Sequence, residues 1–144
     1  MKNYKCVVVA VELLSKSDNR LIEHAKCMAQ DFKADVILVH ATPHEGMYVE
    51  TNIAVEFEVR DALVNASVIK MQELGKRIGI PEKHQIVENG SAKVIILEAA
   101  EKYKADLIIV GSHGRHGLQL LLGSTANAVL NGAKCDVLAV RLKE

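Results

Sequence analysis

The stretch DLIIVGSHGRHGLQLLLGST carries the residue types in this sequence that best suit contact with an anion. Its apolar, strand-like start ends at Gly111, and Gly114 follows; without a Cβ, both residues let a ligand approach the main chain. Gly123 precedes Ser124 and Thr125 at the predicted start of a helix, where backbone N–H groups and the helix dipole favour negative charge. The two hydroxyl groups would add donors for a phosphate. The residues alone allow two interpretations of this segment: a phosphate-binding loop, or an ordinary strand-to-helix connector in which Ser124 caps the helix.

Other polar residues stand at the ends of apolar runs. Glu12 follows the first run, where a carboxylate can accept hydrogen bonds from the hydroxyls of a ribose or can simply be solvated. His113 and His116 lie three residues apart, and His40 ends the second run. No cysteine or carboxylate completes a metal-ligand set with them by spacing, so we interpret them as polar histidines, of which His113 could meet a phosphate. The sequence has no P-loop, GxGxxG fingerprint, GxSxG elbow or HExxH motif, so no motif requires catalysis.

The elements that must position these residues alternate between strand and helix along the chain. Buried strands are predicted from short β-branched apolar runs, and helices from apolar residues at three- and four-residue steps. The predicted strands are residues 5–11, 34–41, 84–88, 105–110 and 135–142, and the predicted helices are residues 18–32, 54–79, 91–104 and 123–133. The candidate N-caps are Ser15, Ser17 and Asp18 for the first helix and Ser91 for the third, while Gly79 and Pro81 end the second.

This alternation predicts an α/β fold: a doubly wound parallel sheet with helices on both faces, in a single domain over residues 1–144. In such sheets, ligands bind at the carboxyl ends of the strands, where the direction of winding reverses. Function is therefore expected at Ala10 to Glu12, at His40 to Thr42, and in a loop that begins at Gly111.

Composition narrows the classes of partner. Lys+Arg and Asp+Glu number 18 each, aromatic residues are 3% of the chain and tryptophan is absent, which argues against recognition of nucleic acid. The apolar runs are too short to span a bilayer, and the N-terminus lacks the cleavage site of a signal peptide. Three widely spaced cysteines, Cys6, Cys27 and Cys135, form no CxxC pair and fit a reducing compartment, so a cytoplasmic location is expected.

Three segments, VVVAVELLSKSDNRLIEHA, ADVILVHA and ADLIIVGSHGRHGLQLLLGSTANAVL, resemble segments of the universal stress proteins, and the resemblance extends over essentially the whole chain. It implies a five-stranded parallel sheet in the order 3-2-1-4-5, of the adenine nucleotide alpha hydrolase-like type. It also implies a homodimer formed by pairing of the last strand, Asp136 to Leu142, which would cover an exposed sheet edge.

Members of this family that bind ATP or AMP share a pattern of glycine, two residues, glycine, nine residues, glycine, and Ser or Thr. Gly111, Gly114, Gly123 and Ser124 supply these anchors, although only eight residues, 115–122, separate the last two glycines. Glu12 stands where binding members usually carry Asp, so its carboxylate lies one methylene farther out. The resemblance implies ATP or AMP, with Mg²⁺ as an accompanying ion, held by residues Ala10, Val11, Glu12, Ala41, Val110, Gly111, His113, Gly114, Gly123, Ser124 and Thr125.

The expected function is that of a regulatory, cytoplasmic stress-response dimer whose state depends on bound adenine nucleotide. Two alternatives stand beside it. The shortened arch could close the pocket, which would leave a scaffold resembling the family's non-binding A-type proteins. Alternatively, Arg115 and Lys16 could support slow ATP hydrolysis, although phosphoryl transfer usually needs a metal clamp and fixed cationic charge.

Overall fold

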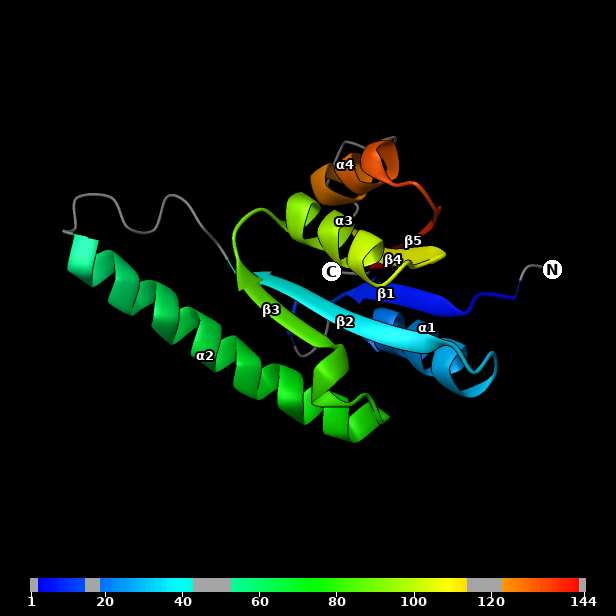
Figure 1. The fold of residues 1–144 in the computed structure, drawn as a ribbon, viewed down its shortest axis with the longest axis horizontal. Coiled ribbons are helices and arrows are strands. Elements are labelled where there is room, and N and C mark those ends of the chain that lie inside the picture. Colours follow the sequence, from blue (N-terminus) through cyan, green and yellow to red (C-terminus); the bar gives the residue numbers. More distant parts are fainter. Residues whose placement is uncertain (1–2, 15–18, 43–52, 114–122, 143–144) are drawn as a thin grey trace.

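The computed structural model describes residues 3–14, 19–42, 53–113 and 123–142 (Figure 1). The candidate N-caps Ser15, Ser17 and Asp18 lie outside these residues, as do Gly114 and the arch 115–122. Lys16 lies outside them as well, and of His113 only the backbone is described; the structure describes the other predicted site residues.

The described part of the chain contains one sheet of five parallel strands. The order is β3-β2-β1-β4-β5, which confirms the predicted order and the α/β fold. The central strand is β1, where Val8 pairs with Ile37 on one side and with Ile108 on the other. The strands are β1 (Cys6–Ala10), β2 (Asp35–Thr42), β3 (Gln85–Asn89), β4 (Leu107–His113) and β5 (Asp136–Leu142).

Helices cover both faces of this sheet (Figure 1). The first face packs against α1 (Asn19–Gln30) and α2 (Ile53–Ile78), and the second against α3 (Ala92–Lys102) and α4 (Ser124–Gly132). Because successive side chains of a strand point to opposite faces, Val7 and Val9 lie in the first core and Val8 in the second. Burial on both faces explains why β1 reads as a continuous apolar run.

At the amino ends of the strands, Asp106 fastens β4 to β1. Its carboxylate accepts hydrogen bonds from the backbone N–H of Lys5 at 2.9 Å and of Cys6 at 3.1 Å. These bonds fix the register of the two strands whose opposite, carboxyl ends are expected to form the site.

The predicted ends of three elements, β4, α2 and α3, can be compared with the structure. The predicted loop at Gly111 is wrong at its start, because β4 continues through His113 and pairs Gly111 with Val140 of β5. Gly79 does end α2, with a φ of +80°. Ser91 occupies the predicted N-cap position of α3, although its side chain makes no capping hydrogen bond in the described structure.

No helix among the described residues is both long enough and apolar enough to cross a membrane. Likewise, the described residues include no group of three or more His, Cys, Asp or Glu side chains that could hold a metal ion.

Candidate functional site

The sheet brings most of the predicted site residues to one edge. Since β1 pairs in parallel with both β2 and β4, the ends of these three strands, at Ala10, Thr42 and His113, lie at the same carboxyl edge. The helices that follow β1 and β4 cover opposite faces, so this edge includes the point where the winding reverses. The structure therefore assembles at one place residues that are about 100 positions apart in the sequence.

The end of β1 is held from β2 by two hydrogen bonds. The backbone N–H of Val11 donates to the carbonyl oxygen of Val39 at 2.9 Å. Nδ1 of His40 lies 2.7 Å from the carbonyl oxygen of Val11. Because a carbonyl oxygen can only accept, Nδ1 carries the proton and is the donor. Val11 is itself buried, and the next residue, Glu12, is exposed. The backbone directly before Glu12 is thus held by hydrogen bonds at both the N–H and the carbonyl group of Val11.

The residues at the ends of β1 and β2 include two with small side chains. Ala10 and Ala41 are half-buried and pack against the core beneath α3 and α4. Val110 is fully enclosed in that same core, so its side chain supports the site from below rather than lining it.

Gly111 is a glycine for a packing reason that the sequence does not show. A Cβ built on this residue would lie 2.4 Å from Cδ1 of Leu142 and 3.5 Å from Cδ1 of Leu21. Leu142 is the last residue of β5 and is buried. The site therefore borders a contact in which an edge-strand side chain fills the space that a side chain at position 111 would need.

The edge strand is also tied to α1. Nη1 of Arg20, in the first turn of α1, donates a 2.6 Å hydrogen bond to the carbonyl oxygen of Arg141. The carboxyl end of β5 is thus connected to the helix that follows β1.

The predicted helix start at Gly123 is confirmed, because Gly123 is the N-cap of α4. Gly123 has a φ of +101°, a conformation that glycine adopts without strain. Its carbonyl oxygen accepts the hydrogen bond from Asn127 N–H, so the N–H groups of Ser124, Thr125 and Ala126 precede the first bond within α4. Both hydroxyl-bearing residues are exposed. Because β4 and β5 are parallel, α4 must start at the carboxyl edge, where the strand ends lie.

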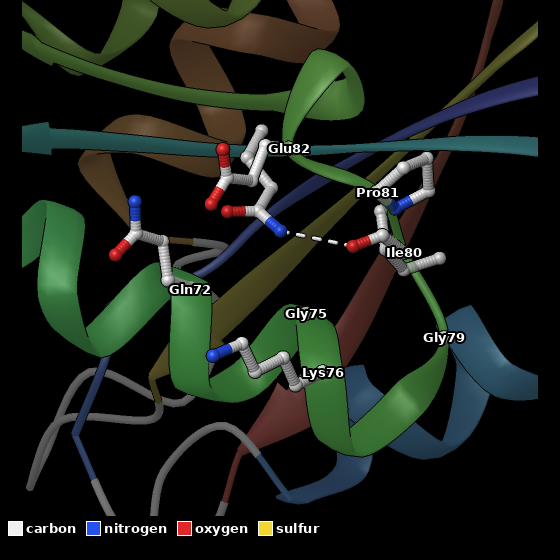
Figure 2. Close-up of a pocket in the computed structure, with 8 residues that line it drawn as sticks. Gln72, Gly75, Lys76, Gly79, Ile80, Pro81 and Glu82 are labelled. Atoms are coloured by element: carbon white, nitrogen blue, oxygen red, sulfur yellow. Dashed lines mark hydrogen bonds between the residues drawn. The ribbon is translucent and has the colours of Figure 1, made fainter.

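A separate open pocket of about 340 Å³ lies between the end of α2 and the start of β3 (Figure 2). One wall is formed where Nε2 of Gln85 donates to the carbonyl oxygen of Ile80 at 2.9 Å, as the dashed line in Figure 2 shows. Its lining residues are Gln72, Gly75, Lys76, Gly79, Ile80, Pro81, Glu82 and Gln85, and no predicted site residue is among them. This pocket is therefore not the predicted site.

Comparison with known proteins agrees with this architecture. The model of the universal stress protein family matches residues 3–141. Universal stress protein A homolog 2 of Coxiella burnetii is 49% identical over 144 residues, which cover 99% of each chain. The chain belongs to the universal stress protein family.

Two solved structures have folds similar to that of this universal stress protein. The structure of hypothetical protein MJ0577 has a TM-score of 0.77 at 25% identity and covers 99% of both chains. A universal stress protein in complex with cAMP has a TM-score of 0.62 at 25% identity, covering 96% of this chain and 98% of the other. The fold is therefore shared with a universal stress protein that holds an adenine nucleotide.

Three residues of this universal stress protein contribute to the site region in ways that the sequence did not predict, although His40 and Ser112 fall within segments where function was expected. His40 was expected as a polar histidine, and its bond to the Val11 carbonyl needs the β1–β2 register to be known. Ser112 is 4% exposed near the end of β4, on the face opposite to Gly111. Leu142 fills the space above Gly111. The only signal available in the sequence was the position of each residue near a strand end.

Proposed function

We propose that this universal stress protein binds adenine nucleotide, as ATP or AMP, at the carboxyl ends of β1 and β4 and acts as a regulatory dimer in the cytoplasm. The observation that carries the proposal is the start of α4, where Gly123, with a φ of +101°, precedes exposed Ser124 and Thr125. A helix start of this kind binds phosphate through its backbone N–H groups and dipole.

The other parts of a nucleotide have counterparts along the same edge. The exposed Glu12 carboxylate would accept hydrogen bonds from the ribose hydroxyls, and the small side chains of Ala10 and Ala41 leave room for a flat base. Mg²⁺ usually binds through substrate phosphates and water, so it would arrive with ATP rather than occupy a separate protein site. The complex of a related universal stress protein with cAMP supports an adenine nucleotide as the ligand class.

The binding experiment is isothermal titration calorimetry of the purified protein with ATP, AMP, cAMP and GTP. The double variant Ser124→Ala/Thr125→Ala should weaken ATP binding about tenfold, because two donors to the phosphates are lost. Glu12→Gln should weaken binding of all the adenine nucleotides by a similar factor, because the ribose is common to them.

Ser91→Ala is the matched control, since Ser91 also precedes a helix and is exposed but belongs to α3. This variant should bind ATP like the unchanged protein. No heat of binding to any adenine nucleotide at millimolar concentration, together with no nucleotide released on denaturing the purified protein, would refute the proposal and leave the scaffold alternative. Binding would also raise the free energy of unfolding by about 2.7 kcal/mol at a ligand concentration one hundred times Kd.

The dimer would form through β5, which lies at the edge of the sheet as the described residues define it. Pairing with a second β5 would satisfy its outward backbone groups and protect the edge from other partners. Hydrogen exchange of the Asp136–Leu142 amides should become slower as protein concentration rises. Exchange rates independent of concentration would exclude this mode of pairing.

The cytoplasmic location rests on cysteine chemistry. Cys6, Cys27 and Cys135 are thiols rather than disulfides, as suits a reducing compartment. Cell fractionation with an antibody to the protein tests this assignment, and recovery outside the cytoplasmic fraction would contradict it.

A further inference from the structure

The long helix α2 carries two different faces. Its C-terminal turns bury Met71, Leu74 and Ile78 against the sheet beside β3 and β2. Its amino-terminal half extends beyond the end of β3 (Figure 1). On the side of the helix away from these buried residues, four apolar residues form what we call the outer stripe, namely Val59, Ala62, Ala66 and Ile69.

The outer stripe has the spacing of a helix-pairing seam. Its residues follow one another at steps of three, four and three, which is the alternation of a and d positions in a heptad repeat. Ala62 and Ala66 are exposed, Ile69 is 58% exposed and Val59 is half-buried. Solvent-facing positions of a surface helix normally carry polar residues, so this periodic apolar face is suited to contact with a partner.

We propose that the outer stripe pairs with the outer stripe of a second copy of this chain, in antiparallel orientation. A twofold axis near Val64 places Val59 opposite Ile69 of the second copy and Ala62 opposite Ala66. The two alanines at the centre let the helix backbones approach closely, while the larger side chains pack at both ends. The pairing involves no part of the nucleotide site and stands independently of the proposed function.

The charges beside the stripe select this partner and this orientation. In an antiparallel pair, side chains that flank the seam at equivalent heptad positions face each other across it. In the register given above, Glu56 faces Lys70 of the second copy, and the twofold axis generates the contact twice. Asn65 then meets Asn65 of the second copy near the axis. In a parallel pair, Glu56 and Lys70 would be about 21 Å apart along the axis.

The outer stripe and β5 lie at opposite edges of the sheet, because α2 packs beside β3 and the strand order ends at β5. Association through α2 therefore does not compete with pairing through β5. The α2 contact would turn a monomer into a dimer, and it would link β5-paired dimers to one another, because each such dimer carries two outer stripes.

The first experiment is sedimentation equilibrium over a concentration series without nucleotide. Glu56→Lys and Lys70→Glu should each raise the dissociation constant of the α2 contact about tenfold, because each creates two like-charge contacts. The double variant Glu56→Lys/Lys70→Glu should restore association, because it exchanges the charges and recreates both attractive pairs. Ala62→Glu should abolish association, whereas the matched control Ala54→Glu, outside the stripe on the same helix, should not change it.

The second experiment locates the contact by thiol cross-linking with a short bis-maleimide. Asn65→Cys should give a covalent dimer, because the axis brings the two copies of this residue together. Asp61→Cys, one turn away and outside the seam, should give much less. Circular dichroism of each variant confirms that the helix is intact.

The proposal is overturned if the unchanged protein shows no association that Ala62→Glu abolishes, or if the charge-exchanged double variant associates no better than the single variants. Equal cross-linking at positions 61 and 65 overturns the antiparallel register.

Discussion

Leu142 determines which residue can stand at position 111. A Cβ at Gly111 would lie 2.4 Å from Cδ1 of Leu142, far below normal contact, and 3.1 Å from Cγ of the same buried side chain, so both atoms would have to shift. Gly111, the first residue of the GSHG segment, thus serves the packing of β5, in addition to any role beside a ligand.

Gly111→Ala should therefore destabilise the protein by about 1–3 kcal/mol, the usual cost of overpacking a core. In a Leu142→Ala background the same change should cost much less, because the obstructing methyl group is gone. Urea unfolding of the four proteins of this double-mutant cycle measures the coupling. Additive free energies would show that Leu142 is not the cause.

Cys27 is a second residue whose chemistry is set by one neighbour. Its thiol donates a 3.3 Å hydrogen bond to Oδ2 of Asp31, which lies four residues later, directly after the end of α1. This bond, with smaller effects of burial and of the Asp31 charge, raises the pKa of Cys27 above the usual thiol value.

Asp31→Asn should lower the pKa of Cys27, because it removes the carboxylate that opposes the thiolate. Since the thiolate is the nucleophile, alkylation of Cys27 by iodoacetamide at pH 8 should become faster. Peptide mass spectrometry gives the rate at each cysteine. The matched control is Asp35→Asn. Burial, and after it the Asp35 charge, raises the pKa of Cys6, so this change acts on Cys6 and should leave Cys27 unchanged. An unchanged or slower rate at Cys27 in Asp31→Asn would contradict this assignment.

At the scale of the element, the end of α2 depends on a close approach between its last turns and the chain that follows. A Cβ at Gly75 would lie 2.0 Å from Nε2 of Gln85 and 2.7 Å from the backbone oxygen of Ile80. The Ile80 carbonyl cannot move without shifting the turn that leads into β3.

Gly75→Ala should destabilise the protein by about 1–3 kcal/mol, even though alanine is the better helix former by about 1 kcal/mol. Gly132→Ala in α4 is the contrasting change. Its Cβ would meet a side-chain end, Leu97 Cδ1, at 2.7 Å, and a rotation of that leucine relieves the contact. Thermal unfolding of both variants should show a much larger loss for Gly75→Ala, and equal losses would count against the backbone contact.

The same scale shows how far sequence can predict this fold. The strands were predictable because burial on both faces requires continuous apolar runs, as in β1 and in β4 up to Val110. The last residues of β4 were not, because Gly111 looks like a strand terminator until its pairing with Val140 and its packing with Leu142 are known. Gly123 was predictable as a helix start from local chemistry alone. The bond between His40 and Val11 was not, since it joins two strands.

At the scale of the whole molecule, balanced charge leaves little repulsion between copies. Lys+Arg and Asp+Glu cancel to a formal net charge of zero at pH 7 with neutral histidine. Proteins without net charge have no long-range repulsion to oppose association.

Solubility in polyethylene glycol should therefore pass through a minimum near pH 7 and rise on both sides. Precipitation measured from pH 5 to pH 9 checks this, and the variant Lys134→Glu should shift the minimum to lower pH. A monotonic solubility curve over this range would contradict the charge argument.

The two contacts that hold the end of β5, from Arg20 to the Arg141 carbonyl and from Leu142 to Gly111, also have a thermodynamic meaning. They join the edge strand to the helix after β1 and to the strand end that borders the candidate site. A displacement of Gly111 by a bound molecule would be transmitted to β5, and strain on β5 from a neighbouring chain would reach Gly111. Linkage of this kind is reciprocal, so occupancy of the site and pairing of the edge would change each other's equilibrium constants by the same factor.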